Sequence, residues 1–245
     1  MSCHTTVKPT MGIIGFGAFG QLIAQHLAPY FDISAYDPMP VVAGTKMTGL
    51  AHAAACEIVV LAVPVAALRE TVLAILPYIS AGTLVLDVGS VKIQTATIMR
   101  ELIPAHIDVV ATHPLFGPQS AQHGLAGLKI ALCPVHGGRH AEVAQFLQAK
   151  LGLEVTITTP QDHDRDLAIV QGLTHLIAKV LTRMEPLPSR MTTRSFDLIV
   201  EAIDMVRDDA PEVFHAIEVA NPYAADVRAQ FFEIARGLDM ELGKL

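Results

Sequence analysis

Several features that mark other classes of protein are absent from this chain of 245 residues. Its three cysteines, Cys3, Cys56 and Cys133, are odd in number and far apart, which argues against a disulfide framework and favours a reducing compartment. No apolar run approaches the ~20 residues that a membrane helix needs. The first residues also lack the charged-then-apolar order of a signal peptide. The cytoplasm is therefore the expected location.

Positive charge is scarce and scattered. The chain has 17 Lys and Arg residues against 24 Asp and Glu residues, which gives a formal net charge of -7. This balance argues against nucleic acid and anionic membranes as partners. Eleven histidines are present, but the sequence contains no HExxH or CxxC motif, so no metal site is expected. The expected partner is a small molecule or a second copy of the chain.

Short β-rich runs alternate with amphipathic segments in the first part of the chain. The expected strands are 11–15, 32–36, 58–63, 83–88, 107–112, 129–133 and 154–158, and the expected helical segments include 21–27, 65–76 and 141–151. Continuous apolar strands that alternate with helices predict a parallel sheet that is buried on both faces. We therefore expect an α/β fold of Rossmann type, with a doubly wound, mostly parallel sheet, over residues 1–159.

Residues 160–245 have a different pattern, with long stretches at the 3.6-residue period of a helix. One helix is expected to begin at Pro160 and to end near Glu185, and a second to run from Ser195 toward Val206, with one or two more after it. The second helix has an apolar stripe that so small a unit does not cover by itself. We expect an all-helical domain that pairs with a second copy of the chain.

A glycine motif lies where the first strand is expected to give way to the first helix. It consists of Gly15, Phe16, Gly17, Ala18, Phe19 and Gly20. Its glycines would permit a tight turn, the approach of a pyrophosphate and close packing of the helix, whose N-terminus favours phosphate. The alternative is a glycine-rich turn without a ligand. Asp37, after the second strand, would accept the ribose hydroxyls of NAD and repel the extra phosphate of NADP, so NAD is expected and NADP is the alternative.

Two further strand ends carry side chains that are suited to chemistry. Ser90 and His113 each follow an expected strand. A histidine can take a proton from an alcohol as hydride leaves the same carbon, and a serine beside it can hold the imidazole or the substrate oxygen. The alternatives are a histidine that caps a loop and a serine in a Gly-Ser turn. Lys92 is expected to be a solvated lysine in the first turn of a helix, and the alternative is a lysine near the phosphates or the substrate carboxylate.

The order of these motifs carries a family resemblance. The glycine motif is followed by Val63-Pro64 in Leu-Ala-Val-Pro, by Ser90 in Asp-Val-Gly-Ser-Val-Lys and by His113 in His-Pro-Leu-Phe-Gly-Pro. The chain resembles prephenate/arogenate dehydrogenases in this respect. The resemblance implies oxidative decarboxylation of prephenate or arogenate with hydride transfer to NAD(P), a step of tyrosine biosynthesis. It also implies that His113 accepts the proton of the ring hydroxyl, that Ser90 supports it, and that Val63 and Pro64 line the cofactor groove.

The resemblance continues into the second part of the chain, with departures. It implies that Gln171 and His175 bind the substrate and that the helical domain forms a homodimer. The alternative for His175 is a buried core histidine. Many family members carry Ser-His-Leu-Pro-His where this chain has Gln-Gly-Leu-Thr-His at 171–175. Many prephenate-specific members also offer an arginine where this chain has Met205, with Arg207 two positions further on. The choice between prephenate and arogenate therefore stays open.

Two other functions fit the same organisation. β-Hydroxyacid dehydrogenases and imine reductases also join a Rossmann domain to a helical domain, and Lys179 is the candidate donor on the long helix. Turnover of 3-hydroxyacids would identify this class. A non-enzymatic redox sensor would bind NAD(H) tightly without turnover, and it would tolerate His113→Ala.

Overall fold

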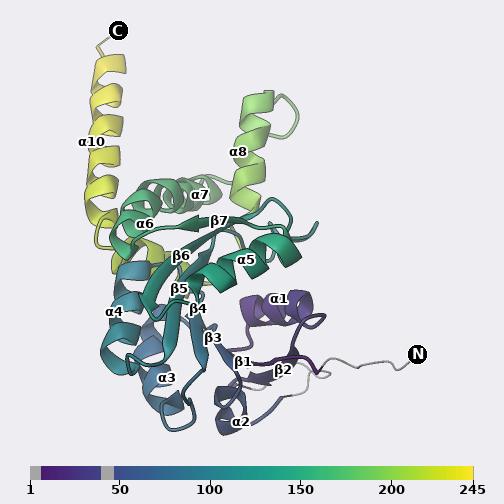
Figure 1. Ribbon diagram of the computed structural model, residues 1–245. Coiled ribbons are helices and arrows are strands. Elements are labelled where there is room, and N and C mark those ends of the chain that lie inside the picture. The colour runs from purple at the N-terminus through teal and green to yellow at the C-terminus, as the bar shows by residue number, and fades with distance from the viewer. Residues whose placement is uncertain (1–6, 40–46, 245) are drawn as a thin grey trace. The chain divides into compact units, whose positions relative to one another are not determined.

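The computed structural model describes residues 7–39 and 47–244, so Cys3 lies outside the described residues. The chain divides into two compact units, Met1–Thr159 and Pro160–Leu245, and each is described by itself. The first unit is an α/β structure and the second is helical (Figure 1).

A seven-stranded sheet forms the centre of the first unit (Figure 1). Its strands are β1 (Thr10–Ile14), β2 (Asp32–Tyr36), β3 (Ile58–Leu61), β4 (Leu84–Asp87), β5 (Asp108–Pro114), β6 (Lys129–His136) and β7 (Glu154–Ile157). They lie in the order β2-β1-β3-β4-β5-β6-β7, and all neighbours are parallel except β5 and β6. The seven expected strands and the doubly wound, mostly parallel sheet are confirmed.

The direction of β6 follows from the connection that precedes it. A parallel pair needs a crossover of about a dozen residues or more, usually a helix. Residues 115–128 form turns and no helix, so the chain returns antiparallel to β5. An apolar run of strand length has the same pattern whether the strand is parallel or antiparallel to its neighbour, so the sequence did not distinguish these two directions.

Helices cover both faces of the sheet. They are α1 (Ala18–Leu27), α2 (Leu50–Ala54), α3 (Leu68–Ile75), α4 (Lys92–Leu102) and α5 (His140–Leu151), with the 3-10 turn η1 (Val65–Ala67). Buried residues of α2, α3 and α4 pack in one cluster with alternate strand residues, whereas α1 and α5 contribute to two clusters on the other face. Burial on both faces explains why the inner strands are continuous apolar runs.

The parallel strands β1 to β5 end at one edge of the sheet. Backbone hydrogen bonds continue the ladder past the strand ends, because Gly15 N–H donates to Tyr36 O (2.8 Å) and Ala62 N–H donates to Ile14 O (2.7 Å). β2 lies on one side of β1 and β3 on the other, so the strand order reverses at β1. Open α/β sheets bind ligands at such a point, outside the carboxyl ends of the strands.

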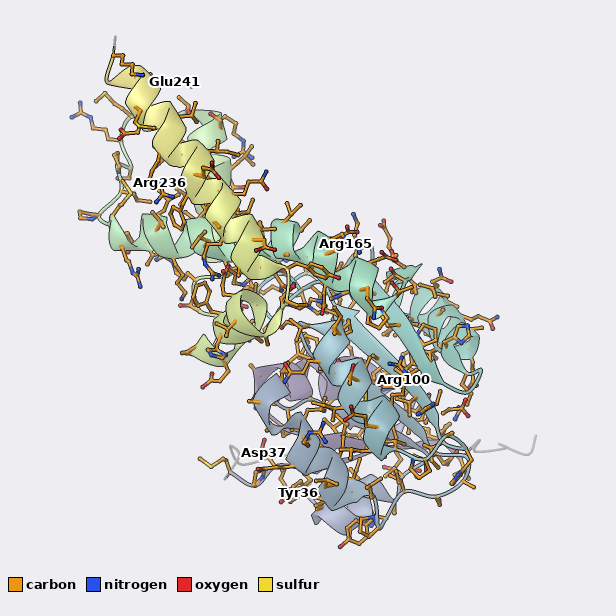
Figure 2. All side chains as sticks on the ribbon, turned by 90° about the vertical axis from the view of Figure 1, so that its left-hand side faces the viewer. Tyr36, Asp37, Arg100, Arg165, Arg236 and Glu241 are labelled. Carbon is orange, nitrogen blue, oxygen red and sulfur yellow. The ribbon has the colours of Figure 1, made fainter. Side chains whose placement is uncertain are left out.

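The second unit is built from helices and two π-helical segments. They are α6 (Pro160–Leu167), η2 (π, Ala168–Gly172), α7 (Leu173–Arg183), α8 (Arg194–Asp204), α9 (Pro211–His215), η3 (π, Ala216–Ala220) and α10 (Ala224–Leu242), the helix on which Figure 2 labels Arg236 and Glu241. The expected long helix begins at Pro160, but it is interrupted by η2 and its α-helical part ends at Arg183. None of the described helices is both long and apolar enough to cross a membrane.

Candidate functional site

The glycine motif forms the turn from β1 to α1, and its three glycines differ in their surroundings. Gly15 has a φ of 95°, and a Cβ there would lie 2.3 Å from Ala62 O. A Cβ on Gly20 would lie 2.2 Å from Gly15 O, so this glycine lets α1 pack on β1. A Cβ on Gly17 would meet no atom within 4 Å. The motif therefore combines two positions that exclude a side chain with one that faces open space.

The open space at Gly17 lies at the N-terminus of α1. Gly17 is the N-cap residue and makes no side-chain capping bond, and Ala18, the first helical residue, is exposed. Backbone N–H groups and the positive end of the helix dipole meet at such a terminus. The space and the donors together fit a phosphate group of a dinucleotide.

Asp37 follows Tyr36, the last residue of β2, and Figure 2 labels both side chains. The Asp37 carboxylate is bonded to the backbone of the glycine turn. Its Oδ2 accepts the N–H of Phe16 at 2.6 Å, and its Oδ1 accepts the N–H of Met39 at 2.8 Å. An ionised carboxylate has about four acceptor sites. Each oxygen therefore keeps capacity for a ribose hydroxyl while it anchors the backbone.

Two further contacts bring predicted residues to this turn. Val63 Cγ1 lies 3.0 Å from the place of a Cβ on Gly15, so the Val63-Pro64 turn adjoins the glycine motif. The ring of Phe19 packs against that of Phe116 with 6.2 Å between centroids. Because Phe116 lies three residues after His113, this contact joins the glycine motif to the histidine segment.

Ser90 and His113 lie at the same edge of the sheet. Ser90 is half-buried in the turn between β4 and α4, and His113 is buried in the last part of β5. His113 shares a face of β5 with Ala111, which packs in the cluster of α3 and α4. Three strand spacings of about 4.8 Å separate β1 from β5, so the glycine turn and His113 are roughly 14 Å apart along the edge. A dinucleotide that lies across the crevice spans such a length.

A buried ion pair joins these two strand ends. Lys92 Nζ lies 2.6 Å from Asp87 Oδ2, and the side-chain exposures are 0% and 1%. The expectation that Lys92 is solvated is therefore wrong. Its position in the first turn of α4 agrees with the sequence pattern, but no pattern identified Asp87 at the end of β4 as its partner.

The second unit pairs His175 with a carboxylate. Nδ1 of His175 lies 2.9 Å from Gln171 O, and Nε2 lies 3.0 Å from Asp209 Oδ2. The His175 ring therefore lies between a backbone carbonyl of η2 and a side-chain carboxylate. Gln171 lies in the π-helical segment η2, and such segments are frequent at functional sites.

Asp209 was not among the residues that the sequence suggested. It lies 34 positions from His175, and no motif connects the two. Of the residues that were suggested, Met205 is half-exposed and Arg207 pairs with Glu185 and with Asp204 (3.2 Å). A carboxylate therefore stands beside His175, while Arg207 is engaged by acids.

Lys179, the candidate donor of the rival dehydrogenase class, is directed at an aromatic ring. Its Nζ lies 5.7 Å from the centroid of Phe214. In the part of the chain that the structure describes, no group of three or more His, Cys, Asp or Glu side chains is arranged to hold a metal ion. The site on the first unit consists of an anion-binding turn with a serine and a histidine, a set that suits proton and hydride transfer.

Comparison with known proteins gives the same picture. Residues 41–159 match the family described as prephenate dehydrogenase, nucleotide-binding domain. The chain is 26% identical over 243 residues to arogenate dehydrogenase 1, chloroplastic, of Arabidopsis thaliana. This match covers 91% of this chain and 38% of that protein. It is 28% identical over 203 residues to a probable arogenate/prephenate dehydrogenase of Methanocaldococcus jannaschii, and this match covers 76% of this chain and 45% of that protein. The chain thus spans less than half the length of these two curated relatives.

A solved structure shares the fold. It is the crystal structure of prephenate dehydrogenase from A. aeolicus in complex with hydroxyphenyl propionate and NAD+, with a TM-score of 0.73 and 22% sequence identity. The likeness covers 97% of this chain and 91% of that one. A Rossmann-type domain followed by a helical part is therefore an architecture that both chains have.

Proposed function

We propose that this chain is a member of the prephenate/arogenate dehydrogenase family and that it catalyses the oxidative decarboxylation of prephenate or arogenate with NAD as the hydride acceptor. This reaction is a step of tyrosine biosynthesis. The match of residues 41–159 to the nucleotide-binding domain of prephenate dehydrogenase and the similarity to arogenate dehydrogenases support this proposal. The observation that carries the proposal is the shared edge of the sheet, where the glycine turn, the Val63-Pro64 turn, Ser90 and His113 lie at the ends of parallel strands.

The first unit offers each part of NAD a matching group. The N-terminus of α1 and the open space at Gly17 would hold the pyrophosphate, and the Val63-Pro64 turn would line the groove beside it. Asp37 would accept the ribose hydroxyls while it keeps its bond to Phe16 N–H. Since a carboxylate repels the 2'-phosphate of NADP, NAD is the preferred cofactor.

The reaction needs one proton acceptor and good alignment. Bound NAD supplies the hydride acceptor. His113 accepts the proton of the ring hydroxyl as the carbon that bears it becomes a carbonyl, and Ser90 holds the imidazole or the substrate oxygen. The ring carboxylate then leaves as carbon dioxide, and its bonding electrons complete the aromatic ring and convert the carbonyl to a phenolate. The phenolate oxygen takes the proton back from His113, which gives the phenol. The protein therefore contributes orientation and a place for the transferred proton.

In the second unit, Gln171 and His175 would bind the substrate, and the carboxylate of Asp209 favours arogenate over prephenate. Arogenate carries an ammonium group where prephenate carries a keto oxygen. Asp209 Oδ2 lies 3.0 Å from His175, and its side chain is 22% exposed. An ammonium gains from such a partly buried anion, whereas a keto oxygen does not. Replacement of Asp209 by Asn should lower kcat/KM for arogenate relative to prephenate.

The helical unit would also form a homodimer. Leu198 and Ile199 on α8 are 49% and 44% exposed, and α10 exposes Ile234 and Leu238. Apolar side chains that gather on the helices of one unit mark a surface for another protein, and a second copy of the chain satisfies it by symmetry. The cytoplasm is the proposed location, because the few scattered cysteines favour a reducing compartment.

The test is a turnover assay with the purified protein. Prephenate and arogenate are each supplied with NAD and with NADP, and the absorbance of the reduced cofactor is followed. We expect turnover with NAD and a higher kcat/KM for arogenate. Turnover of 3-hydroxyacids in place of both substrates would identify the β-hydroxyacid dehydrogenase class. Tight NAD binding without turnover of any substrate would identify a redox sensor.

A further inference from the structure

The Asp87–Lys92 pair contacts the backbone on both sides of the candidate catalytic residues. Asp87 Oδ1 accepts the N–H of Thr112 at 3.1 Å, and Asp87 Oδ2 accepts the N–H of Gly89 at 3.0 Å. Lys92 Nζ donates to Thr112 O at 2.6 Å. Gly89 precedes Ser90 and Thr112 precedes His113, so a single ion pair fixes the residue before each of them.

Two more contacts restrict the backbone at the ends of β4 and β5. Thr112 Oγ1 donates to Asp87 O at 2.5 Å, which ties the end of β4 to the end of β5. A Cβ on Gly89 would lie 3.1 Å from Asp87 Oδ2 and 3.2 Å from Thr95 Cγ2, so the turn is closely packed against the carboxylate. The backbone at Ser90 therefore has little freedom as long as Asp87 stays in place.

Stability alone does not account for this pair. Taking a carboxylate and an ammonium out of water has a large desolvation cost, and replacing a buried ion pair by apolar residues of similar volume is often neutral or stabilising. Asp87 and Lys92 are among the most deeply buried side chains of the first unit, at 1% and 0% exposed. A buried ion pair that adds little to stability but fixes the backbone at two strand ends is suited to orienting the side chains that follow.

We propose that Asp87 and Lys92 are positioning residues that set the distance and angle between Ser90 and His113. This inference rests on the proposed function, because it assigns these two residues to the proton-transfer step. Neither side chain needs to touch the substrate. Their effect passes through the N–H of Gly89 and through the N–H and C=O of Thr112.

The test is the double variant Asp87→Asn with Lys92→Met. It removes both charges at nearly constant volume, so no lone charge remains buried and the fold should persist. The substitution Asp87→Asn turns one carboxylate oxygen into an NH2 group, so the new side chain cannot accept from the two backbone N–H groups with separate oxygens. We expect kcat to fall at least about tenfold, with the dissociation constant of NAD changed less than about threefold. A kcat within twofold of the wild-type value would overturn the proposal.

A second variant covers the case in which the double variant does not fold. Gly89→Ala keeps both charges and needs no unusual φ, but its Cβ presses on Asp87 Oδ2. It should lower kcat about tenfold with NAD affinity retained, and an unchanged kcat would count against the proposal. The matched control is Arg69→Met with Glu101→Gln, which removes an exposed ion pair (2.9 Å) that also involves α4. This control should leave kcat unchanged.

Hydrogen exchange separates this inference from the proposed function. In the wild-type protein the amides of Gly89 and Thr112 should be protected, and in the double variant they should exchange at least about tenfold faster. This readout does not depend on turnover. If the wild-type protein turns over no substrate but the exchange result holds, the proposed function fails and the ion pair still positions the two strand ends. If turnover is observed and the exchange rates are unchanged, the positioning role fails.

Discussion

The two units differ in how far each covers its own apolar residues. The first unit buries large side chains on both faces of its sheet, in three clusters. Among the described residues from 160 onward, Ile203 and Ile217 are the only buried hydrophobic side chains larger than alanine. The same unit exposes Ile199, Ile234 and Leu238 by 44%, 57% and 55%. The first unit therefore buries most of its large apolar side chains, whereas the second leaves many of its own exposed.

The two units also differ in what holds their buried polar side chains. In the first unit, Asp87 is bonded to backbone groups of two strand ends, so it can move only if the sheet moves. In the second, His175 bonds to the side chain of Asp209, which lies next to a short turn before α9. A side-chain pair between helices exchanges partners more easily than a backbone ladder does. The first unit thus holds its buried carboxylate by backbone bonds, whereas the second holds His175 in part by a side-chain partner.

The largest effect should come from the first unit alone. His113→Asn removes the proton acceptor, so kcat should fall at least about 100-fold, which corresponds to about 2.7 kcal/mol in the activation free energy. NAD binding, which depends on the glycine turn, should be nearly unchanged. Steady-state rates and a titration of NAD measure the two quantities. An unchanged kcat would remove His113 from the mechanism.

A negative charge introduced on α8 of the second unit should weaken the proposed dimer. Leu198→Glu places a carboxylate among exposed apolar residues of α8, so the dissociation constant of the dimer should rise at least about 30-fold, or about 2 kcal/mol. Sedimentation over a range of concentrations measures it. Leu73→Glu on α3 is the control, since Leu73 is similarly exposed (50%) but lies in the first unit. A wild-type chain that stays monomeric at all concentrations would break the comparison between the units.

The fold of the first unit could be predicted because its signals are local. The inner strands β3 and β4 are almost wholly apolar runs, and the glycine motif lies between the first strand and the first helix. The antiparallel direction of β6 could not be predicted, because it depends on the route of residues 115–128 and not on the strand itself. The π-helical segments η2 and η3 also leave no separate periodic pattern in a long helical stretch.

The position of a candidate residue in the fold could be predicted where the strand that carries it determines that position. It could not be predicted where a partner far away in the sequence determines it. Ser90 and His113 lie at the sheet edge because they follow apolar runs. Lys92 was misjudged, because a long side chain that begins a helix is usually solvated and only the folded sheet brings Asp87 within 2.6 Å of it. Asp209 was missed for the same reason, since its contact with His175 is made between helices.

A smaller effect should follow from Asp37, which tests whether cofactor choice belongs to the first unit alone. Asp37→Ser removes the charge that repels a 2'-phosphate, so the ratio of kcat/KM for NADP to that for NAD should rise about tenfold, or about 1.4 kcal/mol. The loss of the bond to Phe16 N–H should also weaken NAD binding. Asp32→Ser at the opposite end of β2 is the control. An unchanged ratio would show that another group selects the cofactor.

The smallest effect should come from a surface charge of the first unit. Arg139 holds Glu142 through two hydrogen bonds of 2.9 Å, and this contact keeps the pKa of the Glu142 carboxyl below its usual range and that of Arg139 above its own. The Glu142 side chain is 63% exposed, so solvent screens the pair and Glu142→Gln should cost less than about 0.5 kcal/mol near pH 7. A lowered folded-state pKa stabilises the protein above the unfolded-state value and loses that effect as pH falls through the folded-state value.

The difference in Tm between the wild-type protein and Glu142→Gln should therefore be about 1–2 °C near neutral pH. It should shrink as pH falls below the ordinary carboxyl pKa of about 4.3 and vanish below the lowered folded-state pKa of Glu142. Thermal unfolding at several pH values measures it. A difference that persists in acid would mean that the side chain acts through packing and not through charge. A loss as large as that of a core truncation would mean that the first unit owes its stability to surface charge, which would contradict the contrast between its buried core and the exposed apolar side chains of the second unit.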